Sequence, residues 1–130
     1  MDATIFRIIV GVGHSDVALD FYSKLLDANG QQVGGGRVYF ECGSMILGLL
    51  EKRQPSPMPE HIYFAVGALD KVYARATELR CLSKDNVHGK SAAEIAVRPW
   101  GERSFYVEDP WGNKMCFVDE RTLFTGREAR

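Results

Sequence analysis

Hydrophobic residues in the first half of the chain fall into a strand, a helix and three further short strands. A β-branched run predicts a strand over residues 6–12, which ends at a cluster of glycine and serine. Hydrophobic positions then recur at helical spacing after Ser15, the predicted N-cap, until Asn29 and Gly30 stop the helix. Three short runs that follow predict strands, over residues 31–33, 37–42 and 45–50.

The second half of the chain repeats this order. The run 61–67 matches the run 7–13 at a constant offset of 54 residues and with the same Val-Gly ending. A second helical face begins at Leu69, the polar segment 82–92 is predicted as a long loop or ragged edge, and three strands follow over residues 94–98, 103–108 and 114–119. Two βαβββ modules account for this repetition most simply. Pairing their sheets would cover both inner faces and enclose a trough that can serve as a pocket.

The predicted architecture is a single α+β domain over residues 1–130. The first module covers residues 4–53, a proline-rich linker covers 54–60, the second module covers 61–120, and a tail covers 121–130. With 130 residues, of which 45% are hydrophobic and 25% charged, the chain is long enough to bury a core without disulfide bonds.

Charge and cysteine content narrow the classes of partner and compartment. A formal net charge of −1 offers no basic surface for a phosphate backbone, so no nucleic-acid partner is expected. No signal peptide or membrane span is predicted. Three cysteines without CxxC spacing fit reduced thiols, which indicates a cytoplasmic protein.

The most recognisable motif is the turn Asp109-Pro110-Trp111-Gly112-Asn113 between two predicted strands. Pro110 presets a turn corner, Gly112 tolerates positive φ, and Asp109 can cap the turn through its own side chain. Together with residues 21–22, 61–66 and 103–108, this motif makes the chain resemble the vicinal oxygen chelate superfamily, the group of glyoxalases, bleomycin-resistance proteins and extradiol dioxygenases. The resemblance covers nearly all of residues 4–120 and implies paired mixed sheets around a trough.

The resemblance also implies four metal-ligand positions, one on the first and one on the last strand of each module. They fall on Arg7, Gly48 or a neighbour, His61 and Cys116. An arginine cannot ligate a metal and glycine has no side chain, so two candidate ligands remain, fewer than zinc or magnesium needs. No metal and no other cofactor are therefore expected. A Cys116–His61 nucleophile pair stays open as an alternative, because imidazole can activate a thiol.

Strand alternation predicts which side chains line the trough. It places Arg7, His61, Tyr63 and Cys116 on the inner face. The same alternation places Arg103 and Phe105, and Arg37 and Tyr39, inward as well; in both pairs the arginine stands two residues before the aromatic residue. Trp100 and Trp111 lie in turns, where an indole either stacks on a flat ligand or covers a strand end or dimer contact. The predicted ligand contacts are His61, Tyr63, Arg103, Phe105, Cys116 and Trp111, followed by Arg7, Tyr39 and Trp100.

These residues predict a metal-free protein that binds a bulky, partly planar hydrophobic molecule without transforming it. The resemblance to bleomycin-resistance proteins implies that the molecule is sequestered, that it is a bleomycin-type or other aromatic or peptide antibiotic, and that antibiotic resistance is the outcome. By analogy with the resembled family, a homodimer is expected. The alternative is an enzyme, a glyoxalase-like lyase or isomerase or a dioxygenase, with an unusual metal set that includes His61. A third possibility is a structural or protein-interaction role in which the chain's own side chains fill the trough.

Overall fold

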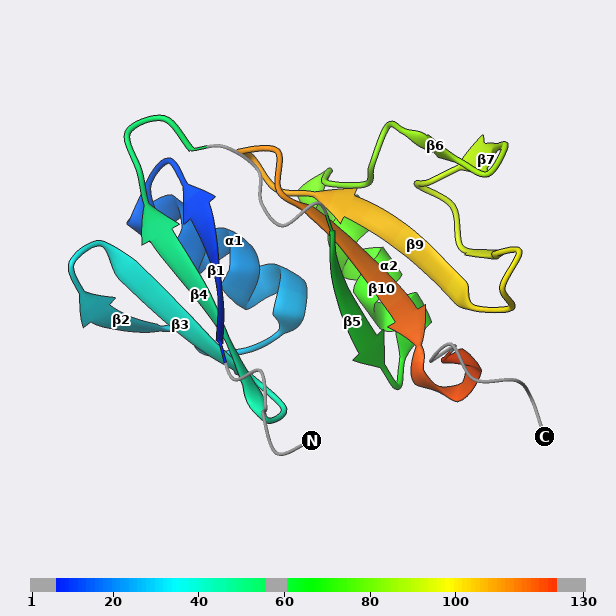
Figure 1. Ribbon diagram of the computed structural model, residues 1–130, viewed down its shortest axis with the longest axis horizontal. Coiled ribbons are helices and arrows are strands. Elements are labelled where there is room, and N and C mark those ends of the chain that lie inside the picture. The colour runs from blue at the N-terminus through cyan, green and yellow to red at the C-terminus, as the bar shows by residue number, and fades with distance from the viewer. Residues whose placement is uncertain (1–6, 56–60, 124–130) are drawn as a thin grey trace, which may run out of the picture. The chain divides into compact units, whose positions relative to one another are not determined.

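A computed structural model describes residues 7–55 and 61–123 (Figure 1). By its internal contacts the chain divides into two compact units. Unit 1 comprises residues 1–60 together with the turn 109–113, and unit 2 comprises residues 61–108 and 114–130. Most of the predicted linker and tail, residues 56–60 and 124–130, lies outside the described ranges.

Unit 1 is a four-stranded mixed sheet with one helix. Its strands follow the order β1-β4-β3-β2, in which β1 and β4 are parallel and the other neighbours antiparallel. The helix α1 packs on β3 and β4 (Figure 1). The elements are β1 (Arg7–Val12), α1 (Ser15–Leu26), β2 (Gln31–Gly34), β3 (Arg37–Cys42) and β4 (Met45–Glu51).

Unit 2 repeats this arrangement. Its main sheet has the order β5-β10-β9-β8 with β5 and β10 parallel, and α2 packs on β9 and β10. A small hairpin and a final 3-10 turn are added. The elements are β5 (Ile62–Val66), α2 (Leu69–Leu79), β6 (Asn86–Val87), β7 (Lys90–Ser91), β8 (Ala96–Val97), β9 (Arg103–Glu108), β10 (Lys114–Asp119) and the 3-10 turn η1 (Glu120–Thr122). The predicted α+β class and the tandem βαβββ order are thereby confirmed.

Details at the ends of elements differ from the sequence prediction. The N-cap of α1 is His14 and not Ser15, because the His14 imidazole accepts the Val17 N–H at 3.4 Å. The helix ends at Leu26, since Asp27 adopts a left-handed conformation with φ 51°. Strand β8 has two residues where five were predicted, and the polar segment 82–92 contains the hairpin β6–β7. Neither helix in the described ranges is long and apolar enough to span a membrane.

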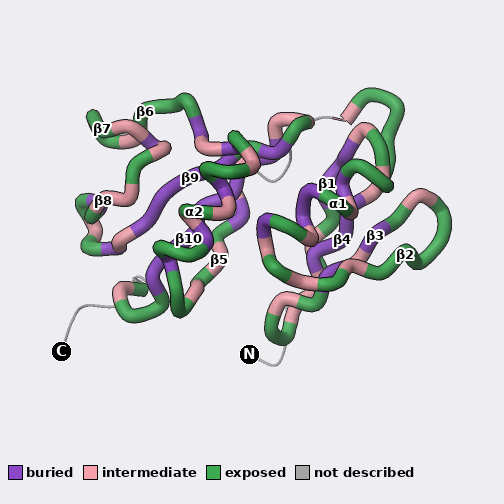
Figure 2. Tube along the Cα trace, turned by 180° about the vertical axis from the view of Figure 1, so that it is seen from behind, coloured by how far each residue is buried: buried purple, intermediate pink, exposed green. Residues whose placement is uncertain are grey.

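The face of each sheet that lies beneath its helix is buried, and in unit 2 the strands β9 and β10 are buried on both faces, as their mostly purple tube shows (Figure 2). In unit 1, alternate residues of three strands pack against Phe21, Tyr22 and Leu25 of α1; they are Val10, Val12, Val38, Phe40, Leu47 and Leu49. In unit 2, the corresponding residues lie beneath α2; they include Ile62, Phe105, Val107, Met115 and Phe117. Because side chains alternate along a strand, the intervening residues define a second face, which we call the open face of each sheet.

The turn 109–113 is fixed within unit 1 by buried hydrogen bonds. Asp109 Oδ1 accepts the backbone N–H groups of Trp111 and Asn113, as the turn prediction required. Its Oδ2 accepts the Tyr22 hydroxyl at 2.8 Å, and Asn113 Nδ2 donates to the Gly11 carbonyl at 2.7 Å. These bonds tie the turn to α1 and β1.

Candidate functional site

Strand register aligns one row of three side-chain positions across the centre of each open face. In unit 1, Gly48 on β4 lies opposite Ile9 on β1 and Tyr39 on β3. In unit 2, Cys116 on β10 lies opposite Tyr63 on β5 and Tyr106 on β9. We call these sets the central rows. Gly48 and Cys116, two of the four ligand positions implied by the resemblance, therefore occupy equivalent places in their sheets.

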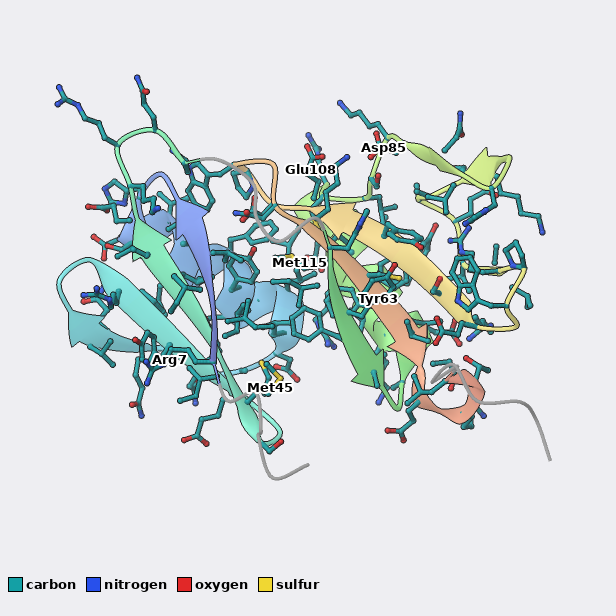
Figure 3. The ribbon with its side chains drawn as sticks, viewed as in Figure 1. Arg7, Met45, Tyr63, Asp85, Glu108 and Met115 are labelled. Carbon is teal, nitrogen blue, oxygen red and sulfur yellow. The ribbon has the colours of Figure 1, made fainter. Side chains whose placement is uncertain are left out.

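The ligand positions of unit 1 are filled by groups that do not bind metal. The guanidinium carbon of Arg7, which is labelled in Figure 3, lies 5.1 Å from the centre of the Tyr39 ring. This is a cation–π contact. Gly48 is covered by the Ile9 side chain and by Tyr39, whose Cε1 would lie 3.0 Å from an added Cβ. A permanently charged guanidinium and a glycine without a side chain offer no atom that can ligate a metal.

The ligand positions of unit 2 are His61 and a buried thiol. Cys116 is 1% exposed and packs with Ala92, Tyr106 and Val118. Burial raises the pKa of the Cys116 thiol to about 11, although hydrogen bonds with Ser104 and Tyr106 act in the opposite direction. A protonated, buried thiol is a poor metal ligand and a poor nucleophile. The four implied positions therefore do not fit a metal, and within residues 7–55 and 61–123 no group of three or more His, Cys, Asp or Glu side chains is placed to hold one.

His61 remains at the edge of this row. Its ring centre lies 5.6 Å from that of Tyr106 in an edge-on contact and 6.2 Å from that of Tyr63. The imidazole is half-buried, so it is positioned as a polar wall residue beside two tyrosines.

Arg98 is a buried cation on the same face that the sequence analysis missed. It is 3% exposed; its Nε–H donates to Ser104 Oγ at 3.0 Å, and its Nη2 donates to the carbonyls of Glu94 and Ser104. Its guanidinium carbon lies 5.2 Å from the Tyr106 ring centre. The hydrophobic pattern carried no signal for it, because an arginine is normally expected at the surface.

A pocket of about 500 Å³ opens beside the central row of unit 2. Its lining consists of Tyr63, Phe64, Ala65, Trp100, Glu102, Val118 and Leu123. Tyr63 is 56% exposed, and the Trp100 indole N–H donates to Glu102 Oε1 at 2.6 Å. The structure thus brings together two of the predicted ligand contacts, Tyr63 and Trp100. It adds Glu102, which sequence reasoning missed because a glutamate before a strand reads as an ordinary surface residue.

Two predicted contacts on β9 were assigned to the wrong face. Phe105 is fully buried beneath α2, stacked on Phe117 and edge-on to Tyr73. Arg103 lies on that same side, 3.3 Å from an Asp70 carboxylate oxygen and 3.6 Å from one of Asp119. It lines a separate groove of about 560 Å³.

The cause is a one-residue offset between the two arginine–aromatic motifs. Tyr39 lies opposite Gly48, and the residue opposite Cys116 is Tyr106, not Phe105. A shift of one residue moves every side chain of a strand to the other face.

Two further predicted contacts are not among the residues that line the pocket. Cys116 lies beneath its neighbours, as described above. Trp111 packs its indole on Gly13 within unit 1, which corresponds to the hydrophobic-cover interpretation of this tryptophan. Arg7 and Tyr39 do lie on the open face of unit 1, in contact with each other.

Comparison with known proteins identifies the family. The profile of the glyoxalase/bleomycin resistance protein/dioxygenase superfamily matches residues 4–117. No curated protein matches. The solved structure titled oxidase ChaP-H1 is 21% identical, with a TM-score of 0.75 over 96% of this chain and 99% of that one.

Two other solved structures have the same fold. The bleomycin resistance determinant encoded on transposon Tn5 is 13% identical, with a TM-score of 0.68 over 92% of this chain and 98% of that one. The lactoylglutathione lyase from Agrobacterium tumefaciens is 21% identical, with a TM-score of 0.65 over 90% and 93%. Both the profile match and the shared fold agree with the motifs around residues 61–66 and 103–113. The chain belongs to the glyoxalase/bleomycin resistance protein/dioxygenase superfamily.

Proposed function

We propose that this protein binds and sequesters a bulky, partly planar hydrophobic molecule without a metal and without transforming it. The observation that carries the proposal is the pocket of about 500 Å³ in unit 2, which has Tyr63 and Trp100 among its walls. Pockets of this size accommodate drug-sized ligands, and aromatic walls favour flat ones. The pocket also counts against a purely structural role in which the chain's own side chains fill the cavity.

The residues at the implied metal positions support the metal-free part of the proposal. Arg7 and Gly48 offer no donor, and the Cys116 thiol is buried and protonated. Catalysis by the metal-dependent members depends on that metal to polarise substrate oxygens. Without a fitting donor set, recognition of a ligand is the function that these side chains support best.

Calorimetry against a panel of aromatic and peptide antibiotics, bleomycin included, tests the binding function. We expect at least one flat compound to bind, and Tyr63→Ala and Trp100→Ala each to weaken that binding by about tenfold. Val97→Ala serves as the control, because Val97 is 59% exposed on the opposite face of the same sheet. Absence of binding by every flat compound overturns the proposal.

Elemental analysis distinguishes the metal-free binding protein from the competing metal-dependent enzyme. His61 keeps an imidazole at the implied position just before β5, with its ring centre 6.2 Å from that of Tyr63, which lines the pocket; this is the observation in favour of a lyase, isomerase or dioxygenase. Protein purified without chelators is expected to contain no stoichiometric zinc, nickel, manganese or iron. Stoichiometric metal that disappears in His61→Ala overturns the metal-free proposal.

Two further parts of the proposal concern the whole protein. A homodimer is proposed by analogy with the family, and light scattering on the eluted peak of a sizing column tests it by giving twice the mass of one chain. Resistance is proposed as the biological outcome. Expression in a sensitive bacterium is expected to raise the inhibitory concentration of the compound that calorimetry identifies, and Trp100→Ala is expected to cancel that increase.

A further inference from the structure

We propose that the groove between α2 and β8 is a docking site for an extended segment of a partner protein. The segment adds to β8 as an antiparallel fifth strand and places a lysine or arginine in the groove. This site goes beyond the binding of a flat molecule, because groove and pocket lie on opposite faces of the sheet of unit 2. The groove has a volume of about 560 Å³. Its lining residues are Asp70, Tyr73, Glu94, Ile95, Ala96, Val97 and Arg103.

The free edge of β8 offers backbone groups to such a segment. β8 is the last strand of its sheet and lies at the margin of unit 2 (Figure 2). The Arg98 N–H donates to the Glu102 carbonyl at 2.7 Å, so these two residues form a hydrogen-bonded pair. Such pairs alternate with non-hydrogen-bonded ones along an antiparallel ladder, so the next pair, Val97 and Arg103, turns its backbone groups away from each other. The Arg103 N–H does so, because it donates to Thr122 Oγ1, and the N–H and C=O of Val97 therefore point out from the edge of the sheet.

The groove beside this edge can receive a side chain of the added strand. Val97 lies opposite Arg103, so its side chain is on the α2 side of the sheet, where it is 59% exposed. In an antiparallel pair, the residue opposite Val97 turns its backbone groups to Val97 and its side chain to the same face. That side chain enters the groove, where Tyr73 forms part of the wall. The Tyr73 ring is fixed edge-on to Phe105, with ring centres 5.2 Å apart, so this wall is formed before the segment arrives.

The charges around the groove favour a basic side chain. The guanidinium of Arg103 is already engaged, at 3.3 Å from a carboxylate oxygen of Asp70 and 3.6 Å from one of Asp119. Glu94 is exposed and makes no ion pair within residues 7–55 and 61–123. Two carboxylates and one arginine thus give the lining a negative balance. A lysine or arginine complements it, and complementarity of this kind contributes more to the choice of partner than to affinity.

A short segment of a partner fits this edge better than a second copy of the chain. β8 is two residues long. A stable dimer buries about 800 Å² of each partner, over about 20–30 residues a side, and a two-residue edge supplies only a small part of that. A few backbone hydrogen bonds and one groove for a side chain suit the reversible capture of an extended peptide.

A fluorescein-labelled peptide of seven residues tests the inference by fluorescence anisotropy. Threonine alternates in it with valine, lysine and valine, so the lysine is central and the three larger side chains share one face. We expect saturable binding below about 1 mM. A methyl group on the backbone nitrogen of the lysine removes its hydrogen bond to Val97 and is expected to weaken binding at least about tenfold. The matched control has the methyl group on the next threonine, whose N–H points away from β8, and is expected to bind like the unmethylated peptide.

Exchanging the lysine for glutamine measures the charge preference. The glutamine peptide is expected to bind about threefold more weakly, because an exposed ion pair contributes little. Glu94→Gln is expected to bind the two peptides equally. The control Glu78→Gln removes the same charge from the exposed surface of α2 outside the groove and is expected to keep the preference. Equal binding of the two peptides by the unmodified protein overturns the choice of a basic side chain.

Val97→Pro locates the binding at β8. Proline removes the outward N–H without removing a bond to β9, so the fold is expected to persist, as circular dichroism would show, and peptide binding to fall at least about tenfold. Should this variant fail to fold, the two methylated peptides still decide on the unmodified protein. Equal binding of those two, or no saturable binding of the parent peptide, overturns the docking site and leaves the pocket's function standing. A peptide that halves the mass in light scattering shows instead that β8 joins two copies, which overturns a partner segment.

Discussion

The two central rows occupy equivalent positions in the same βαβββ topology, yet they are filled and covered differently. Both rows have a buried residue at the centre and an exposed residue at one end, Ile9 at 40% and Tyr63 at 56%, but Tyr39 of unit 1 is half-buried whereas Tyr106 of unit 2 is 4% exposed. The row of unit 1 has a glycine at its centre. The row of unit 2 has a cysteine at its centre that is 1% exposed. Each row also contains a tyrosine, Tyr39 on β3 or Tyr106 on β9, that has an arginine guanidinium over its ring. The guanidinium carbon lies 5.1 Å from the ring centre of Tyr39 and 5.2 Å from that of Tyr106.

The two guanidinium groups come from different elements, and this difference explains the covering. In unit 1 the group belongs to Arg7 at the start of β1, and the edge strand β2 beyond β3 is exposed throughout. In unit 2 it belongs to Arg98, which follows the short edge strand β8 and is itself buried. The segment 82–98 runs along β9, bonding to it at Ser83, Ala92 and Arg98 and closing one end of the row. The topology thus fixes the positions, and the edge segment decides whether the tyrosine of the row meets solvent.

The largest expected difference between the two units concerns thiol reactivity. Burial raises the pKa of Cys116 to about 11, so at pH 8 its thiolate fraction falls about 100-fold below that of an ordinary cysteine. Burial raises the pKa of the Cys42 thiol as well, but Cys42 is only half-buried at the end of β3, so it is expected to react with iodoacetamide faster than Cys116. Peptide mass spectrometry over a time course measures both rates. Equal labelling of Cys42 and Cys116 in the folded protein contradicts the buried row.

The same pKa predicts how stability depends on pH. The folded state favours the neutral Cys116 thiol, because its pKa is raised above the value of about 8.5 for an unfolded chain. Its contribution is therefore fully present below pH 8.5 and is lost as the pH rises towards 11. In Cys116→Ala this part of the alkaline loss of stability is expected to disappear. Urea unfolding at a series of alkaline pH values measures it.

Next in size is the effect of removing the cation that closes the row of unit 2. Arg98→Met is expected to lower the free energy of unfolding by about 2–4 kcal/mol, because two carbonyl groups and a hydroxyl lose their buried donors. The matched variant is Arg37→Met on the exposed face of β3, for which a change within about 0.5 kcal/mol is expected. Urea titration gives both values. A loss of the same size in the two variants contradicts the distinction between a buried and a solvated arginine.

Much of this comparison follows from the sequence, and the part that does not has physical causes. The periodicity and the turn at Asp109 predict the order of elements, since each depends on local residues. The face of a strand depends on register, which is why Tyr63 was assigned correctly and Phe105 was not. Glu102 and Arg98 are polar residues buried where β8 pairs with β9, and nothing in the local pattern marks a charged side chain as buried.

The smallest expected effect tests whether the row of unit 1 requires its glycine. An added Cβ at Gly48 meets the Ile9 side chain and lies 3.0 Å from Tyr39 Cε1, so Gly48→Ala is expected to destabilise the protein by about 1–2 kcal/mol. The control is Gly11→Ala on the same open face, where the nearest side-chain atoms lie 3.4 Å from the new Cβ. That variant is expected to leave stability nearly unchanged, because 3.4 Å is ordinary contact.

Ile9→Val separates overpacking from other costs of the Gly48 substitution. Valine lacks the Cδ1 methyl that meets the new Cβ, so Gly48→Ala is expected to cost about 1 kcal/mol less in the Ile9→Val background than alone. Urea unfolding of the four proteins in this cycle gives the coupling energy. If the coupling is zero, the glycine is not kept by contact with Ile9, and the central row of unit 1 has room for a side chain such as the thiol that unit 2 carries at the equivalent place.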